Sequence, residues 1–237
     1  MSEFKVFPLN TREDIVRFER CFLSYLENHG GYAIQHISLL RTYDALQNTP
    51  DGGRIFSAIL DISINLGLIW CDTAEMGRCI NQVIQVDFAD LSESEATQKS
   101  FELRMKLHHY SNAYIFRYRS LWDKIMGLFV LVLAPTEYEK FCSANSKKRF
   151  FAKIARNGAM LSYEIVEQIQ SAIQKFDDMF RTAEAHGTGF LRKSSFVWTE
   201  LETMDQLKLI DYWNLLNQIA HIIGELFDHH KRIIDEN

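Results

Sequence analysis

The chain of 237 residues is long enough for one large domain or two small ones, and 47% of its residues are hydrophobic while 24% are charged. Such a composition can bury a core, which excludes disorder as the main state. A formal net charge of -5 argues against a surface coated with basic residues for bulk duplex binding, although it leaves room for a local basic cleft. Only 3 prolines and 11 glycines occur, which favours long uninterrupted elements.

The cysteine pattern and the hydropathy indicate a cytoplasmic protein. None of Cys21, Cys71, Cys79 and Cys142 has C-x-x-C spacing, so we expect free thiols in a reducing compartment. The N-terminus lacks the apolar segment of a signal peptide. The longest uncharged apolar run, Ile125 to Ala134, is ten residues long. A membrane span needs about 20 residues, so we expect no membrane contact.

Helical periodicity dominates the first third of the chain. Apolar residues at i, i+3 and i+4 steps predict an amphipathic helix from Thr11 to the glycines at 30–31. A second helix is predicted over residues 32–48, and the turn-forming cluster at 49–53 ends it. The third segment, from Ile55 toward Trp70 or Val86, is almost wholly apolar. It fits one buried helix, two short helices or, because of its β-branched residues, a strand.

Capping boxes mark further helices. Ser92 and Glu95 predict the start of a helix of about 40 residues that ends before Pro135, with a break near Ser111 or Gly127 left open. Thr136 and Glu139 form a second capping box, which predicts a short helix to Cys142. Another helix is predicted over Lys147 to Arg156.

Two more amphipathic helices are predicted in the last third. One covers residues 161–180 and stops before Gly187 and Gly189. The other follows a capping box at Thr199 and Glu202, and its apolar seam is typical of antiparallel bundles. We therefore expect a single all-α domain over 1–237, an antiparallel helical bundle with long helices. A weaker division separates an N-terminal helical layer, 1–90, from a core bundle, 92–237.

Several kinds of active site are absent from the sequence. It contains no Glu-x-x-His pair of di-iron bundles, no H-E-x-x-H zinc motif, no phosphate-binding P-loop, no G-x-G-x-x-G and no G-x-S-x-G. His221 and Glu225 share one helix face, but two ligands are too few to define a metal site. We therefore predict no metal and no cofactor.

One pair of residues has the spacing of a possible active site. Arg181 precedes His186 by five residues, at the end of a predicted helix and directly before Gly187. This segment resembles the HEPN superfamily of helical-bundle domains, many of which are metal-independent ribonucleases in defence and toxin–antitoxin systems. Their signature is Arg, four to six residues of any kind, then His. The sequence departs from the usual pattern at Thr182, where Asn or another polar residue is common, and at Thr188, where one subgroup has a modified Tyr.

The resemblance implies a HEPN-like core over 92–237, with Arg181 and His186 as the catalytic residues. It also implies a homodimer, because two copies of the motif form one composite cleft in that family. RNA or a nucleotide would be the ligand, and a cognate antitoxin or regulatory protein a further partner. A diverged relative would bind RNA or nucleotide without cleaving it.

The residue types suit metal-free RNA cleavage. RNA carries its own nucleophile, the 2′-OH, and histidine titrates near neutrality and can serve as base or acid. Arginine keeps its charge and binds two phosphate oxygens at once. On an ideal helix the two residues lie about 140° apart, so one copy makes a poor site by itself.

The spacing of arginine and histidine is not unique to this segment. A second Arg-x4-His match, Arg104 and His109, lies inside a predicted helix, and an ion pair with Asp177 would account for Arg181 structurally. A basic cluster within 147–156 predicts either a nucleic-acid contact or a solvated helix face. The rival function is a non-enzymatic α-helical scaffold or partner-binding module. A weaker alternative is a ligand sensor with an aromatic pocket formed by Trp70, Tyr118, Trp122 and Trp213.

Overall fold

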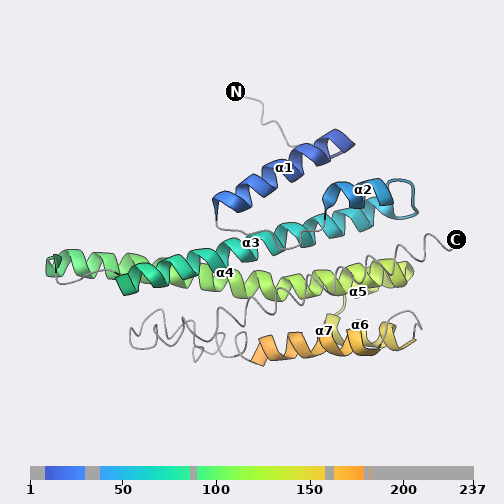
Figure 1. Ribbon diagram of the computed structural model, residues 1–237. Helices are drawn as coiled ribbons and strands as arrows, with labels where there is room; N and C mark the ends of the chain where they lie inside the picture. Colours follow the sequence, from blue (N-terminus) through green and yellow to red (C-terminus); the bar gives the residue numbers. More distant parts are fainter. Residues whose placement is uncertain (1–8, 30–37, 86–89, 158–162, 179–181, 183–237) are drawn as a thin grey trace, which may run out of the picture.

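A computed structural model describes residues 9–29, 38–85, 90–157, 163–178 and 182 of the chain. Within these residues the protein is all-α and has no strand, which confirms the predicted helical bundle. Two long antiparallel helices, α3 and α4, run side by side through the molecule (Figure 1). Helices α1 and α2 lie on the α3 side of this pair, and α5, α6 and α7 lie on the α4 side.

Helix α1, Arg12–Asn28, starts at a capping box. The backbone N–H of Asp14 donates to the Thr11 hydroxyl at 3.2 Å, and the N–H of Thr11 donates to the Asp14 carboxylate at 3.1 Å. Hydrogen bonding to the carboxylate, chiefly from the Thr11 side chain and also from the backbone N–H groups of Thr11 and Asn10, lowers the pKa of the Asp14 carboxyl. An ion pair of 2.9 Å between Arg12 and Asp44 joins α1 to α2, Leu39–Leu46. Helix α2 corresponds to the second half of the helix predicted over residues 32–48, while residues 30–37 lie outside the described residues.

Helix α3, Gly52–Gln85, resolves the alternatives that its apolar sequence left open. It is one continuous helix of 34 residues, neither two helices nor a strand. The predicted turn before it is present, with Asp51 at a φ of 58°. Gly52 is required there, because a Cβ atom at this position would lie 1.9 Å from the Leu46 carbonyl oxygen.

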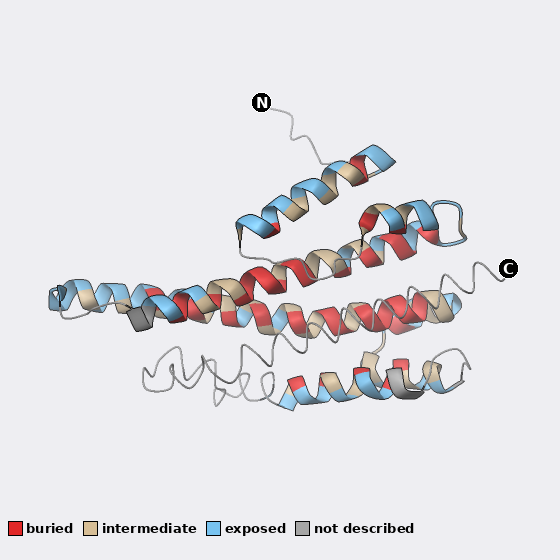
Figure 2. Ribbon diagram, in the orientation of Figure 1, coloured by how far each residue is buried: buried red, intermediate tan, exposed pale blue. Residues whose placement is uncertain are grey.

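The apolar character of α3 also bears on membrane contact. Among the described helices, the stretch Gly52–Gln82 is long and apolar enough to cross a bilayer. However, 56% of its most apolar window is buried against the rest of the protein, as in the core helix of a bundle. Figure 2 shows this burial as a band shared by the facing sides of α3 and α4.

Helix α4, Glu93–Leu133, is unbroken over 41 residues, so neither Ser111 nor Gly127 interrupts it. The predicted capping box is present: the N–H groups of Glu95 and Ser92 each donate to the other residue's side chain, at 3.4 and 3.1 Å. Its apolar face packs along the length of α3, and this is the most extensive contact between described helices. A partly buried ion pair between Asp72 and Arg117 also links the two helices.

The capping box predicted at Thr136 and Glu139 is not formed. Proline fixes its own φ, and a 3₁₀ turn starts at Pro135 and runs to Glu137. Thr136 therefore lies inside this turn, and α5, Tyr138–Cys142, begins without a side-chain cap.

Helices α6, Lys147–Asn157, and α7, Tyr163–Phe176, match the two predicted segments closely. The last predicted helix, after Thr199, lies outside the described residues. All four cysteines are free thiols, as expected; Cys71 and Cys79 are buried, whereas Cys21 and Cys142 are exposed.

Candidate functional site

The two predicted catalytic residues, Arg181 and His186, lie outside the described residues. The structure does describe the end of α7 that leads to them. There the Phe176 ring is fully buried and stacks on Tyr118 of α4 with ring centroids 4.1 Å apart. Asp177 forms an ion pair of 3.2 Å with Arg119 of α4. The chain therefore enters the motif from a helix end that α4 holds in place.

Asp177 is also the residue considered as an ion-pair partner of Arg181, which lies outside the described residues. The carboxylate of Asp177 has a cationic partner on α4, because Arg119 lies between Asp177 and Asp123, with which it pairs at 2.7 Å. The structure thus gives the Asp177 carboxylate a cationic partner on another helix.

The second sequence match does not form a joint site. Arg104 and His109 both lie on the unbroken helix α4, where five residues correspond to about 140° around the axis. Arg104 is half-buried, and burial lowers the pKa of its guanidinium. His109 is exposed, and its ring meets the edge of Tyr110 with centroids 5.3 Å apart. The two side chains therefore leave α4 on different sides.

The basic cluster is concentrated on one helix. Helix α6 contains five Lys and Arg residues and no Asp or Glu, in a chain whose net charge is -5. Its apolar side is formed by Phe150, Phe151, Ile154 and Ala155, which pack toward the core. Because these positions share one side of the helix, most of the cations point to the opposite side.

Four of these cations surround a hollow of about 540 Å³ between α6 and α7. We refer to it as the basic hollow; its described lining consists of Lys148, Arg149, Ala152, Lys153, Arg156 and Gln170. The Lys148 ammonium donates to Gln174 of α7 at 2.8 Å. Arg149, Lys153 and Arg156 form no ion pair with any residue in the described part of the chain. Within the described part of the chain, these three positive charges are thus available to an anionic ligand.

The residues that line the basic hollow are not the same set as the basic cluster predicted within 147–156. Lys147 belongs to the sequence cluster but lies over the Phe141 ring, 5.7 Å from its centroid, and lines a different cavity. Gln170 of α7 joins the hollow although it is far from the cluster in sequence. No sequence signal identifies Gln170, because its place depends on how α7 packs beside α6.

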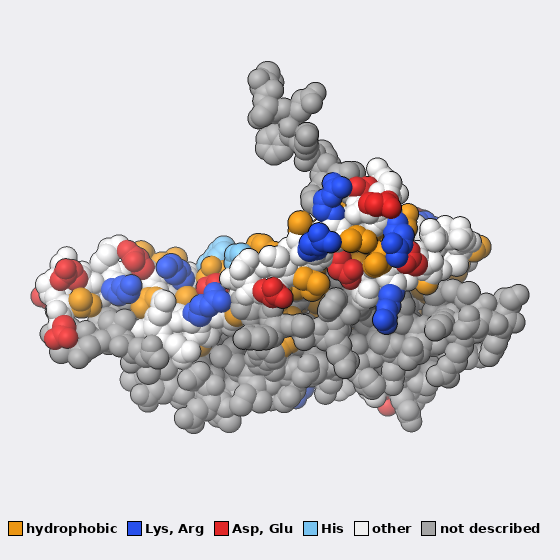
Figure 3. Space-filling model, turned by 45° about the horizontal axis from the view of Figure 1, so that its top comes forward, with side chains coloured by type: hydrophobic (Ala, Val, Ile, Leu, Met, Phe, Trp, Pro, Cys, Tyr) orange, Lys and Arg blue, Asp and Glu red, His pale blue; other side chains and the backbone are white. Residues whose placement is uncertain are grey.

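The face of the protein that carries α1 and α3 has a different charge pattern. Over the described helices visible in Figure 3, Lys and Arg side chains lie interspersed with Asp and Glu side chains. Several of these charges form ion pairs, such as Arg12 of α1 with Asp44 of α2 and Arg78 with Glu75 within α3. Mixed charge of this kind gives a weak field, so α6 is the better candidate for binding a polyanion.

The described residues contain no cluster of three or more His, Cys, Asp or Glu side chains that could hold a metal ion. The aromatic residues suggested as a ligand pocket are instead part of the core. Trp70, Tyr118 and Trp122 are 3%, 0% and 0% exposed, and burial raises the pKa of the Tyr118 phenol. The fourth, Trp213, lies outside the described residues.

Comparison of the chain with protein-family models, with curated proteins and with solved structures gives no match. Function is therefore inferred from the chain's own residues and their placement.

Proposed function

We propose that this protein binds RNA along the basic side of α6 and cleaves it, as a homodimer, through Arg181 and His186. The observation that carries the proposal is the basic hollow, where Arg149, Lys153 and Arg156 have no acidic partner among the described residues. An RNA backbone is the natural partner for several cations on one helix face that have no acidic partner among the described residues. The protein acts in the cytoplasm, and a cognate antitoxin or regulatory protein controls it.

The proposed reaction follows from the residue types. A histidine, His186 of one copy, takes the proton of the 2′-OH, whose oxygen attacks the neighbouring phosphorus. The bond from phosphorus to the 5′-oxygen breaks, and that oxygen receives a proton from an imidazolium, which the partner's copy of the motif supplies. Arg181 binds the phosphate oxygens and stabilises their developing charge. The products are a 2′,3′-cyclic phosphate and a 5′-hydroxyl, and no metal or cofactor takes part.

The cleavage step is tested with purified protein and a mixed RNA pool in EDTA. We expect the wild type to leave cyclic-phosphate ends, and Arg181→Ala or His186→Ala to abolish cleavage. The matched control is Arg104→Ala/His109→Ala, which removes the same residue types at the same spacing from α4 and should leave cleavage unchanged. Cleavage that survives in the Arg181 and His186 variants would remove the assigned residues from the mechanism.

The binding step is tested separately by fluorescence anisotropy with a labelled single-stranded RNA. Arg149→Glu/Lys153→Glu should weaken binding by about tenfold or more and flatten the salt dependence, because fewer phosphates are neutralised. Arg41→Glu/Lys99→Glu makes the same charge change on exposed positions of α2 and α4 and should have a smaller effect. Equal losses would mean that only the net charge matters. Binding without cleavage by the wild type would identify a diverged RNA-binding relative.

A specific observation favours the second candidate, a scaffold or partner-binding module. Phe101, Met105 and Phe116 are exposed on α4, and their spacing places them within about 60° of one another around the helix. Exposed large apolar side chains on one face are typical of an interaction surface. If Phe101→Ser/Phe116→Ser changes the mass measured by light scattering but leaves RNA binding intact, this face serves assembly. No change in mass would count against that use.

A further inference from the structure

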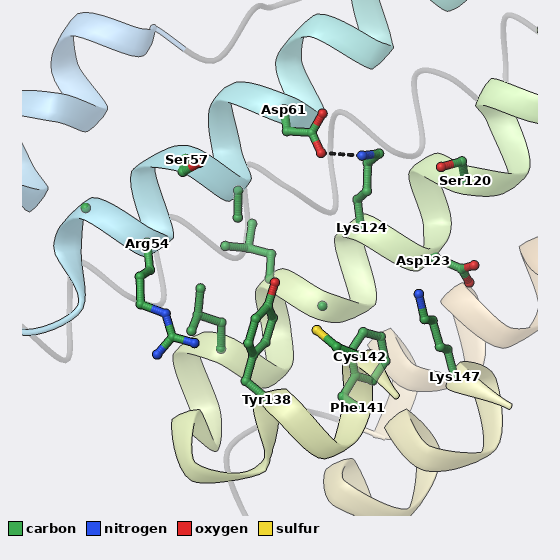
Figure 4. A pocket seen from close by; sticks show the side chains of 15 residues that line it. Arg54, Ser57, Asp61, Ser120, Asp123, Lys124, Tyr138, Phe141, Cys142 and Lys147 are labelled. Atoms are coloured by element: carbon green, nitrogen blue, oxygen red, sulfur yellow. Dashed lines mark hydrogen bonds and ion pairs between the residues drawn. The ribbon is translucent and has the colours of Figure 1, made fainter. Parts of the chain in front are cut away.

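A second cavity, of about 650 Å³, lies where α3, α4, α5 and α6 meet (Figure 4). We call it the four-helix cavity. It is of the size that holds small organic ligands, which is roughly 300–1,000 Å³. The cavity is separate from the basic hollow, since the two share no described lining residue.

The floor of this cavity is apolar and partly aromatic. Tyr138, Phe141 and Cys142 rise from α5 between the two long helices and α6 (Figure 4). Gly127 of α4 keeps the floor open, because a Cβ atom there would lie 3.2 Å from the Phe141 ring. Burial is the main cause that raises the pKa of the Tyr138 phenol. Such a floor suits a flat, apolar ring.

The cationic side chains around the cavity differ in whether an acidic side chain already pairs with them. Lys124 at the upper edge is paired with Asp61, as drawn in Figure 4. At one end, Arg54 is paired with Glu139 at 3.1 Å and with Asp51 at 3.4 Å.

At the other end, Lys147 forms no ion pair with any described residue, and its ammonium lies 5.7 Å from the Phe141 ring centroid. The neighbouring Asp123 pairs with Arg119 at 2.7 Å. The Lys147 end is therefore the place where an added anion gains most.

We propose that the four-helix cavity binds a small molecule with a flat apolar ring and one anionic group, a carboxylate or a phosphate. The ring lies against Tyr138 and Phe141, and the anion lies at Lys147. Ser57 and Ser120 supply hydroxyl groups at the walls for further hydrogen bonds. This site is independent of the proposed RNA chemistry, since it uses none of the residues assigned to binding or cleaving RNA.

The probe is anilinonaphthalenesulfonate, a fluorescent molecule with flat rings and one anion. Lys147→Gln should weaken its binding by about fivefold to tenfold, since one charge contact is lost, while Lys148→Gln on the same helix but outside the cavity should not. Phenylnaphthylamine, which lacks the anion, should bind both variants equally. Equal loss in the Lys147 and Lys148 variants would overturn the assignment of the anion subsite.

The location is tested by blocking the cavity and by thiol protection. Ser57→Trp adds bulk at an exposed position of α3 and should abolish binding, and an unchanged melting temperature shows that the fold is intact. In a Cys21→Ser background, bound probe should slow alkylation of Cys142, while burial, which raises the pKa of the Cys71 and Cys79 thiols, keeps those two unreactive. Full binding by Ser57→Trp together with unprotected Cys142 would place the probe elsewhere and refute the site.

The two candidate headgroups are then compared by displacing the probe. Indoleacetate supplies a ring with a carboxylate, and phenyl phosphate supplies a ring with a phosphate. Displacement by one and not the other assigns the anion, and displacement by neither contradicts the proposed ligand class.

Discussion

At the scale of single residues, the ion pair between Asp72 of α3 and Arg117 of α4 joins the two longest helices. Asp72 is 4% exposed, and burial raises the pKa of its carboxyl, while the Arg117 guanidinium offsets part of that rise. Because the pKa is higher in the folded than in the unfolded state, the folded protein retains a proton that the unfolded chain has lost. The free energy of unfolding therefore falls as the pH rises from the unfolded pKa, about 3.9, through the folded one.

Removing the Arg117 guanidinium should reveal the free-energy cost of burying the Asp72 carboxylate. We expect Arg117→Met to lower the free energy of unfolding by about 2 kcal/mol near pH 7, less than for a fully enclosed pair because Arg117 is a third exposed. The pKa of Asp72 should rise further in the variant, so its loss relative to wild type grows with increasing pH. Urea denaturation at about pH 4.5 and about pH 7 measures both effects.

Two variants control for this interpretation. Asp72→Asn in the Arg117→Met background should recover part of the loss, because it removes the unpaired carboxylate. Arg78→Met breaks an ion pair with Glu75 at the surface of α3 and should cost less than about 0.5 kcal/mol. A loss that does not depend on pH would attribute the effect to the packing of the Arg117 stem instead.

At the scale of elements, two glycines within α3 have different reasons to be there. A Cβ atom at Gly67 would lie 2.6 Å from the Phe22 ring and 2.8 Å from Leu26, so this glycine allows α1 to approach α3 closely. A Cβ atom at Gly77 would meet no described heavy atom within 4 Å. The helix backbone alone disfavours glycine at both positions.

Alanine substitution separates the two roles. Gly77→Ala should raise the free energy of unfolding by about 0.5–1 kcal/mol, the gain expected from helix propensity. Gly67→Ala should gain less than this or destabilise, because Phe22 and Leu26 must move away. Thermal denaturation of both variants measures the difference. An equal gain at the two positions would show that α1 does not depend on the close approach.

At the scale of the whole molecule, the α3–α4 pair separates two layers. Helices α1 and α2 pack on α3, whereas α5, α6 and α7 pack on α4 and on one another (Figure 1). Ile15 of α1 and Phe176 of α7 are both fully buried, on opposite sides of the pair. The two residues therefore lie in different layers of the described part of the chain.

The two layers should respond independently to small core changes. Ile15→Val and Phe176→Leu should each cost about 1 kcal/mol, and the double variant should equal their sum to within about 0.5 kcal/mol. Hydrogen exchange should increase in α1 for the first variant and in α7 for the second. A coupling energy well above that margin would mean that the layers communicate through the α3–α4 pair.

Local sequence features predicted most of the helices because their physical causes are local. The stripe from Ile15 to Leu26 and the capping box of Ser92 and Glu95 lie within one or a few helical turns, so they act before any tertiary contact forms. The capping box predicted at Thr136 was wrong for a local reason too, because a 3₁₀ turn begins at Pro135 and includes Thr136. The continuity of α3 was left open because an apolar run is compatible with several buried elements.

The sequence by itself therefore determined an all-α chain, the extent of most described helices and the concentration of positive charge on α6. Only the tertiary structure decided which of those charges act together: it places Lys147 over Phe141 in the four-helix cavity and brings Gln170 to the basic hollow. It also paired Asp177 with Arg119 of another helix. The physical reason is that helical periodicity fixes which residues share a face, whereas the neighbours of that face depend on how helices distant in sequence pack together.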